Sequence, residues 1–267
     1  MDFTTVLGIL IGVISLILGF VLEGGTVGSL IQLTAAIIVF GGTIGAVVLS
    51  SPFHKLKKIP FILKYAFFKK KVDPNDTIEQ LITLSNISRR EGLLALEDVI
   101  QEGDNEFLKE GVQMIIDGVE ADMIQDIFSR KVEQYEEKMT SIGKIFELAG
   151  GFAPTMGIIG TVMGLVHILG QLDSPQTLGP SIAIAFIATL YGVASANVIY
   201  LPIFNKIKAN LEEEVLLMEL QAEGLLSIQY GENSAILRSK LIAFLDGNDV
   251  RSTGRQEMAE SGSGRDE

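Results

Sequence analysis

The sequence predicts an all-α membrane protein with four transmembrane helices and a cytoplasmic helical domain carried by extensions of the third and fourth spans. Three observations predict this fold class. Of the 267 residues, 48% are hydrophobic, and the mean hydropathy is +0.38. Four apolar segments have about the 20-residue length that crosses the hydrocarbon core of a bilayer. The charged residues are segregated from these segments along the chain.

The four apolar segments are Phe3–Leu22, Leu30–Leu49, Ala149–Leu169 and Ile182–Leu201. The first lacks a basic leader and a small-residue cleavage pattern, so we interpret it as a retained span and not as a signal peptide. None of the four contains Asp, Glu, Lys or Arg. Each segment is therefore predicted to be a transmembrane helix.

The basic residues indicate which way the spans face. The connections EGGTVGS and GQLDSPQTLGPS contain no Lys or Arg; of the 21 basic residues, 14 lie between residues 51 and 148 and seven follow residue 201. Cytoplasmic loops of membrane proteins carry the excess of Lys and Arg. We therefore expect both termini and the central segment to be cytoplasmic. Four buried helices of a large soluble enzyme would not explain so complete an asymmetry.

The cytoplasmic part is predicted to be helical. Asp76-Thr77-Ile78-Glu79 resembles a capping box that opens a helix. Gly92 is expected to interrupt that helix, and GLLALEDVIQE and a segment from about Glu106 to Asp117 form two more. From Ala121 the helical pattern continues into the third span, and the fourth span runs on past its end in the same way. The predicted divisions are 1–50 for the first two spans, 51–148 for the cytoplasmic helical domain, 149–201 for the last two spans, 202–250 for C-terminal cytoplasmic helices and 251–267 for a disordered tail.

Small residues form a stripe on each of the last two spans. Gly157, Thr161 and Gly164 share one side of the third span, and Thr189 lies in a similar stripe with Gly192 on the fourth. Small-xxx-small stripes allow close helix packing. Both threonines lie near mid-membrane, where a hydroxyl bonds to a backbone carbonyl or replaces part of the hydration shell of a passing cation. The residues alone leave both roles open.

Two prolines lie on the cytoplasmic side of the same spans. Pro154 is where the third span enters the bilayer, and Pro202 is where the fourth leaves it. Proline removes a backbone donor and kinks a helix. Each proline is either a simple bend or a hinge between the membrane and cytoplasmic parts.

The absence of charge from the spans narrows the function. Ion transport usually needs an ionisable group at depth in the membrane. If this chain moves ions, the carboxylate comes from a partner. A stand-alone channel or transporter and a structural scaffold remain alternatives. An enzyme is not expected, because the chain has two His, no Cys, no Gly-x-Ser-x-Gly and no phosphate loop. The net charge of −12 argues against nucleic acid.

Three sequence motifs resemble the MotA family, the larger stator subunit of the bacterial flagellar motor. They are GGFAPTMGIIGTVMGL in the third span, ATLYGVASANVIYLPI in the fourth and RREGLLALE in the cytoplasm, and the resemblance extends from Met1 to about Val250. Energiser subunits of Tol and Ton systems belong to the same wider family but have three spans, so four spans favour the motor branch.

The resemblance implies a homo-pentamer in the bacterial inner membrane around two copies of a MotB-like partner. That partner has a single span with an aspartate and binds peptidoglycan. Passage of H⁺ or Na⁺, with no resident cofactor, would turn the pentamer and step the flagellar rotor switch protein. By the motifs, Arg89 or its neighbour Arg90, together with Glu97, correspond to the rotor-contacting charges. Thr161 and Thr189 correspond to the ion path, and Pro154 and Pro202 to the prolines that couple ion flow to conformation.

Overall fold

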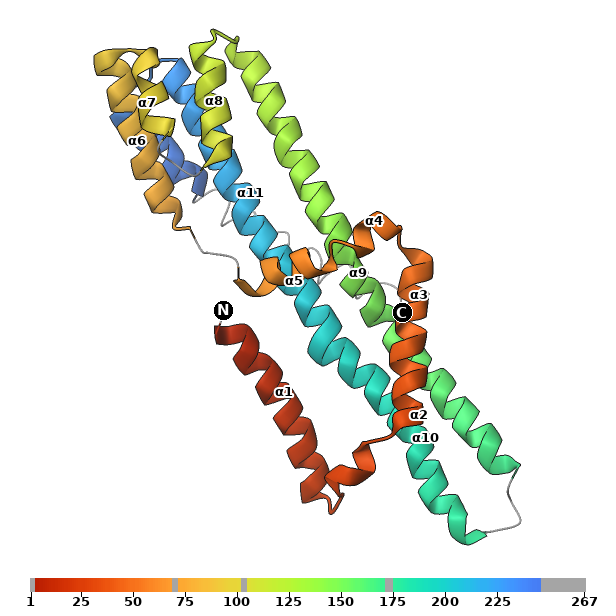
Figure 1. The fold of residues 1–267 in the computed structure, drawn as a ribbon. Coiled ribbons are helices and arrows are strands. Elements are labelled where there is room, and N and C mark those ends of the chain that lie inside the picture. Colours follow the sequence, from red (N-terminus) through yellow and green to blue (C-terminus); the bar gives the residue numbers. More distant parts are fainter. Residues whose placement is uncertain (1–2, 69–71, 102–104, 171–174, 246–267) are drawn as a thin grey trace, which may run out of the picture. The chain divides into compact units, whose positions relative to one another are not determined.

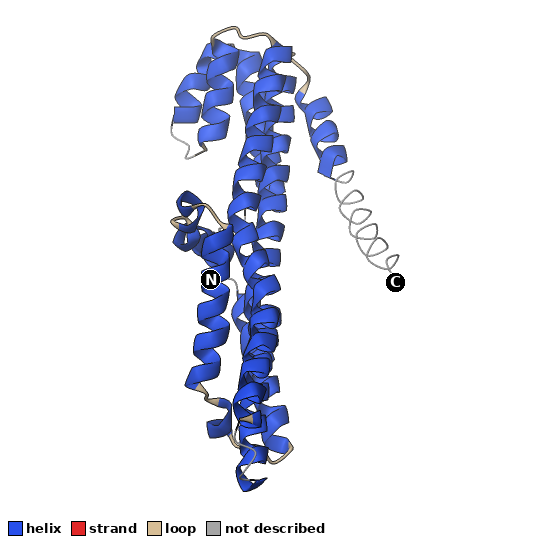
Figure 2. Ribbon diagram, turned by 90° about the vertical axis from the view of Figure 1, so that its right-hand side faces the viewer, coloured by secondary structure: helices blue, strands red, loops and turns tan. Residues whose placement is uncertain are grey.

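The computed structural model describes residues 3–68, 72–101, 105–170 and 175–245, and its elements in those ranges are all helical (Figure 2). The predicted all-α class is confirmed. The chain divides into two compact units. The first unit comprises Met1–Lys69 and Lys138–Leu211, and the second comprises Lys70–Glu137 and Glu212–Glu267. Two long helices, α9 and α11, each continue from one unit into the other.

The first unit begins with apolar helices. The elements in order are α1 (Phe3–Leu22), the 3₁₀ turn η1 (Val27–Leu30), α2 (Leu33–Ala36), the π-helical turn η2 (Ile37–Gly41) and α3 (Gly42–Ser50). The predicted second span started at Leu30, but the α-helix starts at Leu33 because Ile31 and Gln32 are extended. Exposed Leu and Ile side chains cover α1, as expected for a surface that faces lipid.

The rest of the first unit contains the short helices that follow α3 and parts of two long helices. After α3 come α4 (Phe53–Leu56) and α5 (Ile59–Phe68), followed later in the chain by part of α9 (Ala121–Leu169). The return helix consists of α10 (Pro175–Ser195), the π-helical turn η4 (Ala196–Tyr200) and α11 (Leu201–Gln229) (Figure 1). As predicted, α9 is continuous from Ala121 into the third span. The fourth helix starts earlier than the predicted Ile182, because Pro175 suits a first helical turn, where an amide donor has no partner.

Among the described residues, three stretches of helix are long and apolar enough to cross a membrane by length and composition. They lie within Val27–Ser50, Ala121–Val166 and Ala185–Gln229. The apolar part of α1 for which side chains are described, Leu7–Leu22, is shorter. Several apolar membrane helices are thus present, and the count of four spans stays a prediction.

The second unit contains the cytoplasmic helices predicted from the sequence. They are α6 (Pro74–Glu91), the 3₁₀ turn η3 (Leu93–Ala95), α7 (Leu96–Gln101), α8 (Glu106–Ile116) and a helical segment at 234–245. The expected capping box at Asp76 is wrong, because Asp73 is the N-cap and its carboxylate accepts from the Asn75 amide at 2.8 Å. Pro74 then occupies the first turn, where its missing donor costs nothing.

Gly92 ends α6, as predicted, with φ of +91°, a conformation that favours glycine. The core of the unit is formed by fully buried side chains from all its helices, including Leu81, Leu108, Phe128 and Leu225. A methyl group at Gly111 would lie 2.4 Å from Leu225 and 2.6 Å from Phe128, so α8 packs closely at this position. The predicted domain divisions stay predictions, and the predicted tail 251–267 lies outside the described residues.

Candidate ion-path site

The small-residue stripes predicted on the third and fourth spans lie on α9 and α10 (Figure 1) and contact each other. At Gly192 an added Cβ would lie 2.4 Å from the carbonyl oxygen of Ala153 and 3.1 Å from Cα of Gly157. At Gly157 it would lie 2.9 Å from the carbonyl oxygen of Ala188. These neighbours are backbone atoms, so the two helices touch main chain to main chain. Only glycine allows this approach.

Thr161 and Thr189 meet at this contact. Their hydroxyl oxygens are 2.5 Å apart, and both residues are half-buried. The Thr161 hydroxyl also lies 3.2 Å from the carbonyl oxygens of Gly157 and Ala185, and the Thr189 hydroxyl lies 3.3 Å from the carbonyl oxygen of Gly157. Four oxygen atoms from two helices therefore cluster within hydrogen-bonding distance. We call these four atoms the oxygen cluster.

The hydroxyl protons of the oxygen cluster can be assigned by counting. Each threonine has one proton to donate, and a hydroxyl oxygen also accepts. The two hydroxyl oxygens are 2.5 Å apart, so one hydroxyl donates to the other, and the second donates to the carbonyl oxygen of Gly157 or Ala185. At least one hydroxyl thus bonds to a backbone carbonyl, which is the packing role that the sequence allowed. The same oxygens are the ligand type that hard cations prefer.

Pro154 and Pro202 lie on the same pair of helices, Pro154 three residues before Gly157 and Pro202 ten residues after Gly192. Pro154 is half-buried inside α9, so the carbonyl of Gly150 has no amide donor at position 154. Leu201 packs against Gly150, with 2.5 Å between its Cδ2 and the position of an added Cβ. Pro202 is exposed and follows the π turn η4, whose wide ring is closed by the Leu201 amide donating to Ala196. Both prolines therefore interrupt backbone hydrogen bonding within about one helical turn of the Gly150–Leu201 contact.

One residue near the site was not anticipated from the sequence. Tyr191, two residues after Thr189, donates its hydroxyl to the carbonyl of Leu30 and accepts from the Gln32 amide at 3.1 Å. Its ring stacks on Phe40 with centroids 6.0 Å apart. These bonds supply partners to the extended backbone between η1 and α2. A tyrosine within an apolar span was the available signal, since a buried phenolic hydroxyl needs a partner.

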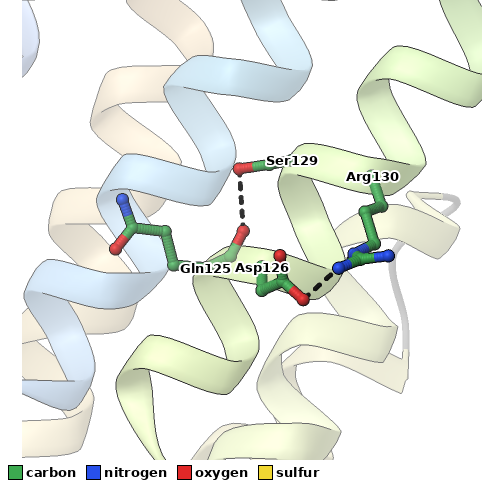
Figure 3. Close-up of polar contacts among 4 residues, drawn as sticks. All are labelled: Gln125, Asp126, Ser129 and Arg130. Atoms are coloured by element: carbon green, nitrogen blue, oxygen red, sulfur yellow. Dashed lines mark hydrogen bonds and ion pairs between the residues drawn. The ribbon is translucent and has the colours of Figure 1, made fainter.

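The three charged residues predicted to contact the rotor lie in the second unit. They are Arg89, Arg90 and Glu97. Arg89 and Arg90 are exposed in the last turn of α6, and Glu97 is exposed in the first turn of α7. Within the described ranges none of the three forms an ion pair. Arg130 of α9 behaves differently, because its Nε donates to Asp126 at 3.0 Å one turn earlier (Figure 3). The side chains of Arg89, Arg90 and Glu97 are thus available to bind another protein.

The described residues contain no group of three His, Cys, Asp or Glu able to hold a metal ion. The described residues of the four apolar segments predicted as spans contain hydroxyls and carbonyls but no carboxylate. These features define a class: a polytopic helical membrane protein with a polar contact between two apolar helices and a second, helical unit.

Comparison with known proteins gives the family. Residues 6–92 match the family model described as motility protein A N-terminal, and residues 99–220 match the MotA/TolQ/ExbB proton channel family. Motility protein A of Bacillus subtilis is 37% identical over 100% of this chain and 99% of its own length. Chemotaxis protein PomA of Vibrio alginolyticus is 33% identical over 92% of this chain and 96% of its own. The flagellar MotAB stator complex of B. subtilis has a chain with a TM-score of 0.87 and 36% identity, covering 94% of this chain and 99% of that one.

The chain belongs to the motility protein A family, as its three motifs predicted. It is a stator subunit of the bacterial flagellar motor, and its family is one of ion channels and not of enzymes.

Proposed function

We propose that five copies of the chain surround two copies of a single-span MotB-type partner, and that ions flow between the two proteins. The observation that carries the proposal is the oxygen cluster of Thr161 and Thr189 in spans without a charged side chain. A cation in hydrocarbon needs both ligands and a counter-charge. The chain supplies ligands, so the counter-charge is assigned to a carboxylate on the partner's helix.

The oxygen cluster is suited to transient contact. The proton of each threonine hydroxyl can rotate about the C–O bond, so the lone pairs of the oxygen can point toward a passing cation. The lone pairs then replace part of the ion's hydration shell, as carbonyl rings do in selective channels. The proposal covers H⁺ and Na⁺ alike, and no resident cofactor is needed.

The prolines and charged residues extend this proposal to rotation. Pro154 and Pro202 interrupt backbone hydrogen bonds beside the helix contact, so bending there costs less than in a regular helix. Occupation of the partner's carboxylate would bend the spans at these positions. The exposed Arg89, with Arg90, and Glu97 would dock on the flagellar rotor switch protein. This arrangement requires both termini and the second unit to be cytoplasmic, in the inner membrane.

Ion flux into proteoliposomes tests the partner requirement. We expect no flux from vesicles that contain the chain alone, and flux when the partner is co-reconstituted. Flux through the chain alone would show that the charge carrier does not come from a second protein.

The Thr189→Val substitution tests the oxygen cluster. Valine keeps the shape and removes the hydroxyl, so we expect normal membrane insertion and assembly with swimming lost or shifted in its sodium dependence. The matched control is Thr155→Val, because the Thr155 hydroxyl is exposed and bonds only within its own helix, to Phe152 at 2.8 Å. Thr189→Val cells that swim like wild type at every sodium concentration would leave Thr189 with a packing role alone.

A further inference from the structure

The segment after α3 exposes aromatic side chains and basic side chains together. The large exposed residues are Phe53 (70% exposed) in α4 and Phe61 (56%) and Phe68 (58%) in α5. Lys57, Lys58 and Lys64 are exposed in the same segment, and Lys57 lies over the ring of Phe53, 4.9 Å from its centroid. Three exposed phenylalanines within sixteen residues leave aromatic area in contact with solvent, which water does not favour.

Helical spacing places two of the phenylalanines and one of the lysines on one side of α5. Phe61, Lys64 and Phe68 are spaced by three and four residues, so they share one face. The opposite face is buried through Ile62 and Ala66. A face that mixes aromatic rings with lysines is typical of helices at the membrane–water boundary, where rings enter the acyl region and lysines reach the headgroups.

The fold holds this face in a fixed orientation. The last four carbonyls of a helix have no partner inside the helix. In α5, two of them, those of Tyr65 and Ala66, accept from the Asn210 side-chain amide at 3.2 and 3.3 Å. Asn210 is 5% exposed and belongs to α11 in the same unit. Pro52 is extended and separates the end of α3 from α4. Helices α4 and α5 therefore directly follow the apolar stretch Val27–Ser50, which is long enough to span a membrane (Figure 1).

We propose that α4 and α5 form a binding surface for anionic phospholipid headgroups, with Phe53, Phe61 and Phe68 inserted beside the acyl chains and Lys57, Lys58 and Lys64 on the phosphates. The occupant follows from charge complementarity and from position. Basic clusters directly after a membrane span attract anionic lipids. A protein neighbour would need carboxylates opposite the lysines, whereas a bilayer with anionic headgroups supplies both the charge and the apolar phase.

The sequence contains no tryptophan, so a tryptophan introduced by substitution is the only one in the variant and its fluorescence reports on that position alone. The Phe61→Trp variant of the full chain carries a single tryptophan. It would be reconstituted into vesicles of phosphatidylglycerol and phosphatidylcholine in which one lipid or the other has brominated acyl chains, which quench tryptophan on contact. Tyr230→Trp, at a 60% exposed position in the second unit, is the control that should not be quenched by either lipid.

We expect the brominated phosphatidylglycerol to quench the single tryptophan of Phe61→Trp with a relative binding constant at least about fivefold above that of phosphatidylcholine, the effect of one lysine near an anionic surface. The preference should fall as salt is raised. Adding Lys57→Gln, Lys58→Gln and Lys64→Gln should remove the preference, and the corresponding Lys→Arg triple variant should keep it.

Two outcomes would overturn the proposal. Equal, salt-independent quenching by both lipids would mean contact with the bilayer without recognition of anionic headgroups. No quenching by either lipid would mean that protein, such as a second copy of the chain, covers this face. The experiment measures no ion flux, so its result is independent of the proposed ion path.

Discussion

The main-chain contact between α9 and α10 makes Gly192→Ala an informative substitution. The new methyl group would lie 2.4 Å from the carbonyl oxygen of Ala153, and that oxygen belongs to a helix backbone that cannot rotate away. Relief of the overlap to an ordinary van der Waals contact of 3.4 Å or more requires the helices to separate locally by roughly 1 Å. Overpacking of this kind typically costs about 1–3 kcal/mol.

The oxygen cluster should be lost in the same variant. Thr161 and Thr189 bridge the helices one turn from Gly192, and their bonds to carbonyls are already 3.2 to 3.3 Å long. A further separation moves them beyond useful hydrogen-bond length. We therefore expect Gly192→Ala to lower the unfolding temperature in detergent and to abolish swimming when it complements a deletion strain.

Gly151→Ala is the matched control. It lies on α9 beside the same contact, and an added Cβ meets nothing within 4 Å. Alanine favours a helix over glycine by roughly 1 kcal/mol, so this variant should be at least as stable as wild type and should swim. If Gly192→Ala melted and swam like Gly151→Ala, the close approach of α9 and α10 would have no bearing on stability or function.

Three further substitutions test other parts of the molecule. Replacing Pro154 or Pro202 by Leu restores an amide donor and stiffens the helix, so we expect assembly without rotation in tethered cells; normal rotation in both variants would make them incidental bends. Arg89→Glu and Glu97→Lys, at exposed sites worth only about 0–1 kcal/mol to folding, should leave expression unchanged and impair swimming, with partial rescue by an opposite reversal on the rotor; failure of every rotor reversal would rule out charge pairing. Burial lowers the pKa of Lys240, but the hydrogen bond to Glu223 and the charges of Glu223 and Glu232 outweigh this and raise the pKa above its ordinary value. The contribution of Lys240 to stability is therefore present at neutral pH and is lost as the pH rises through the raised value. The difference in stability between wild type and Lys240→Met should therefore vanish in strong alkali, and a difference that persists there would indicate packing instead of charge.

The sequence predicted the features that depend on composition along one helix. Apolar length identified the long helices, Gly92 identified the end of α6, and the spacing of small residues placed Thr161 and Thr189 each in a stripe of small residues on its own span. These signals are local, because each is set by helix periodicity or by the conformational range of one residue.

Features that depend on two distant segments could not be predicted in this way. The start of α6 was misplaced because both Asp73 and Asp76 suit an N-cap; the proline that follows Asp73 was the available signal, and the side-chain bond to Asn75 shows that Asp73 is the cap. The π turns and the bond from Asn210 to the end of α5 have no periodic signature. That Thr161 and Thr189 touch is likewise a property of the packed pair of helices, since a stripe does not fix the register between two helices.

Tyr191 fixes the position of the fourth span relative to the backbone that precedes α2, in addition to its contact with α9. Thr189 contacts α9, and Tyr191, two positions later on the same turn of α10, holds the backbone on either side of Ile31. One turn of α10 thus fixes its rotation relative to α9 and relative to the segment between η1 and α2. Inserting or deleting a single residue between these positions would rotate one side chain relative to the other by about 100°. Both contacts can therefore form together only if the spacing between Thr189 and Tyr191 is kept, as well as the identity of the two residues.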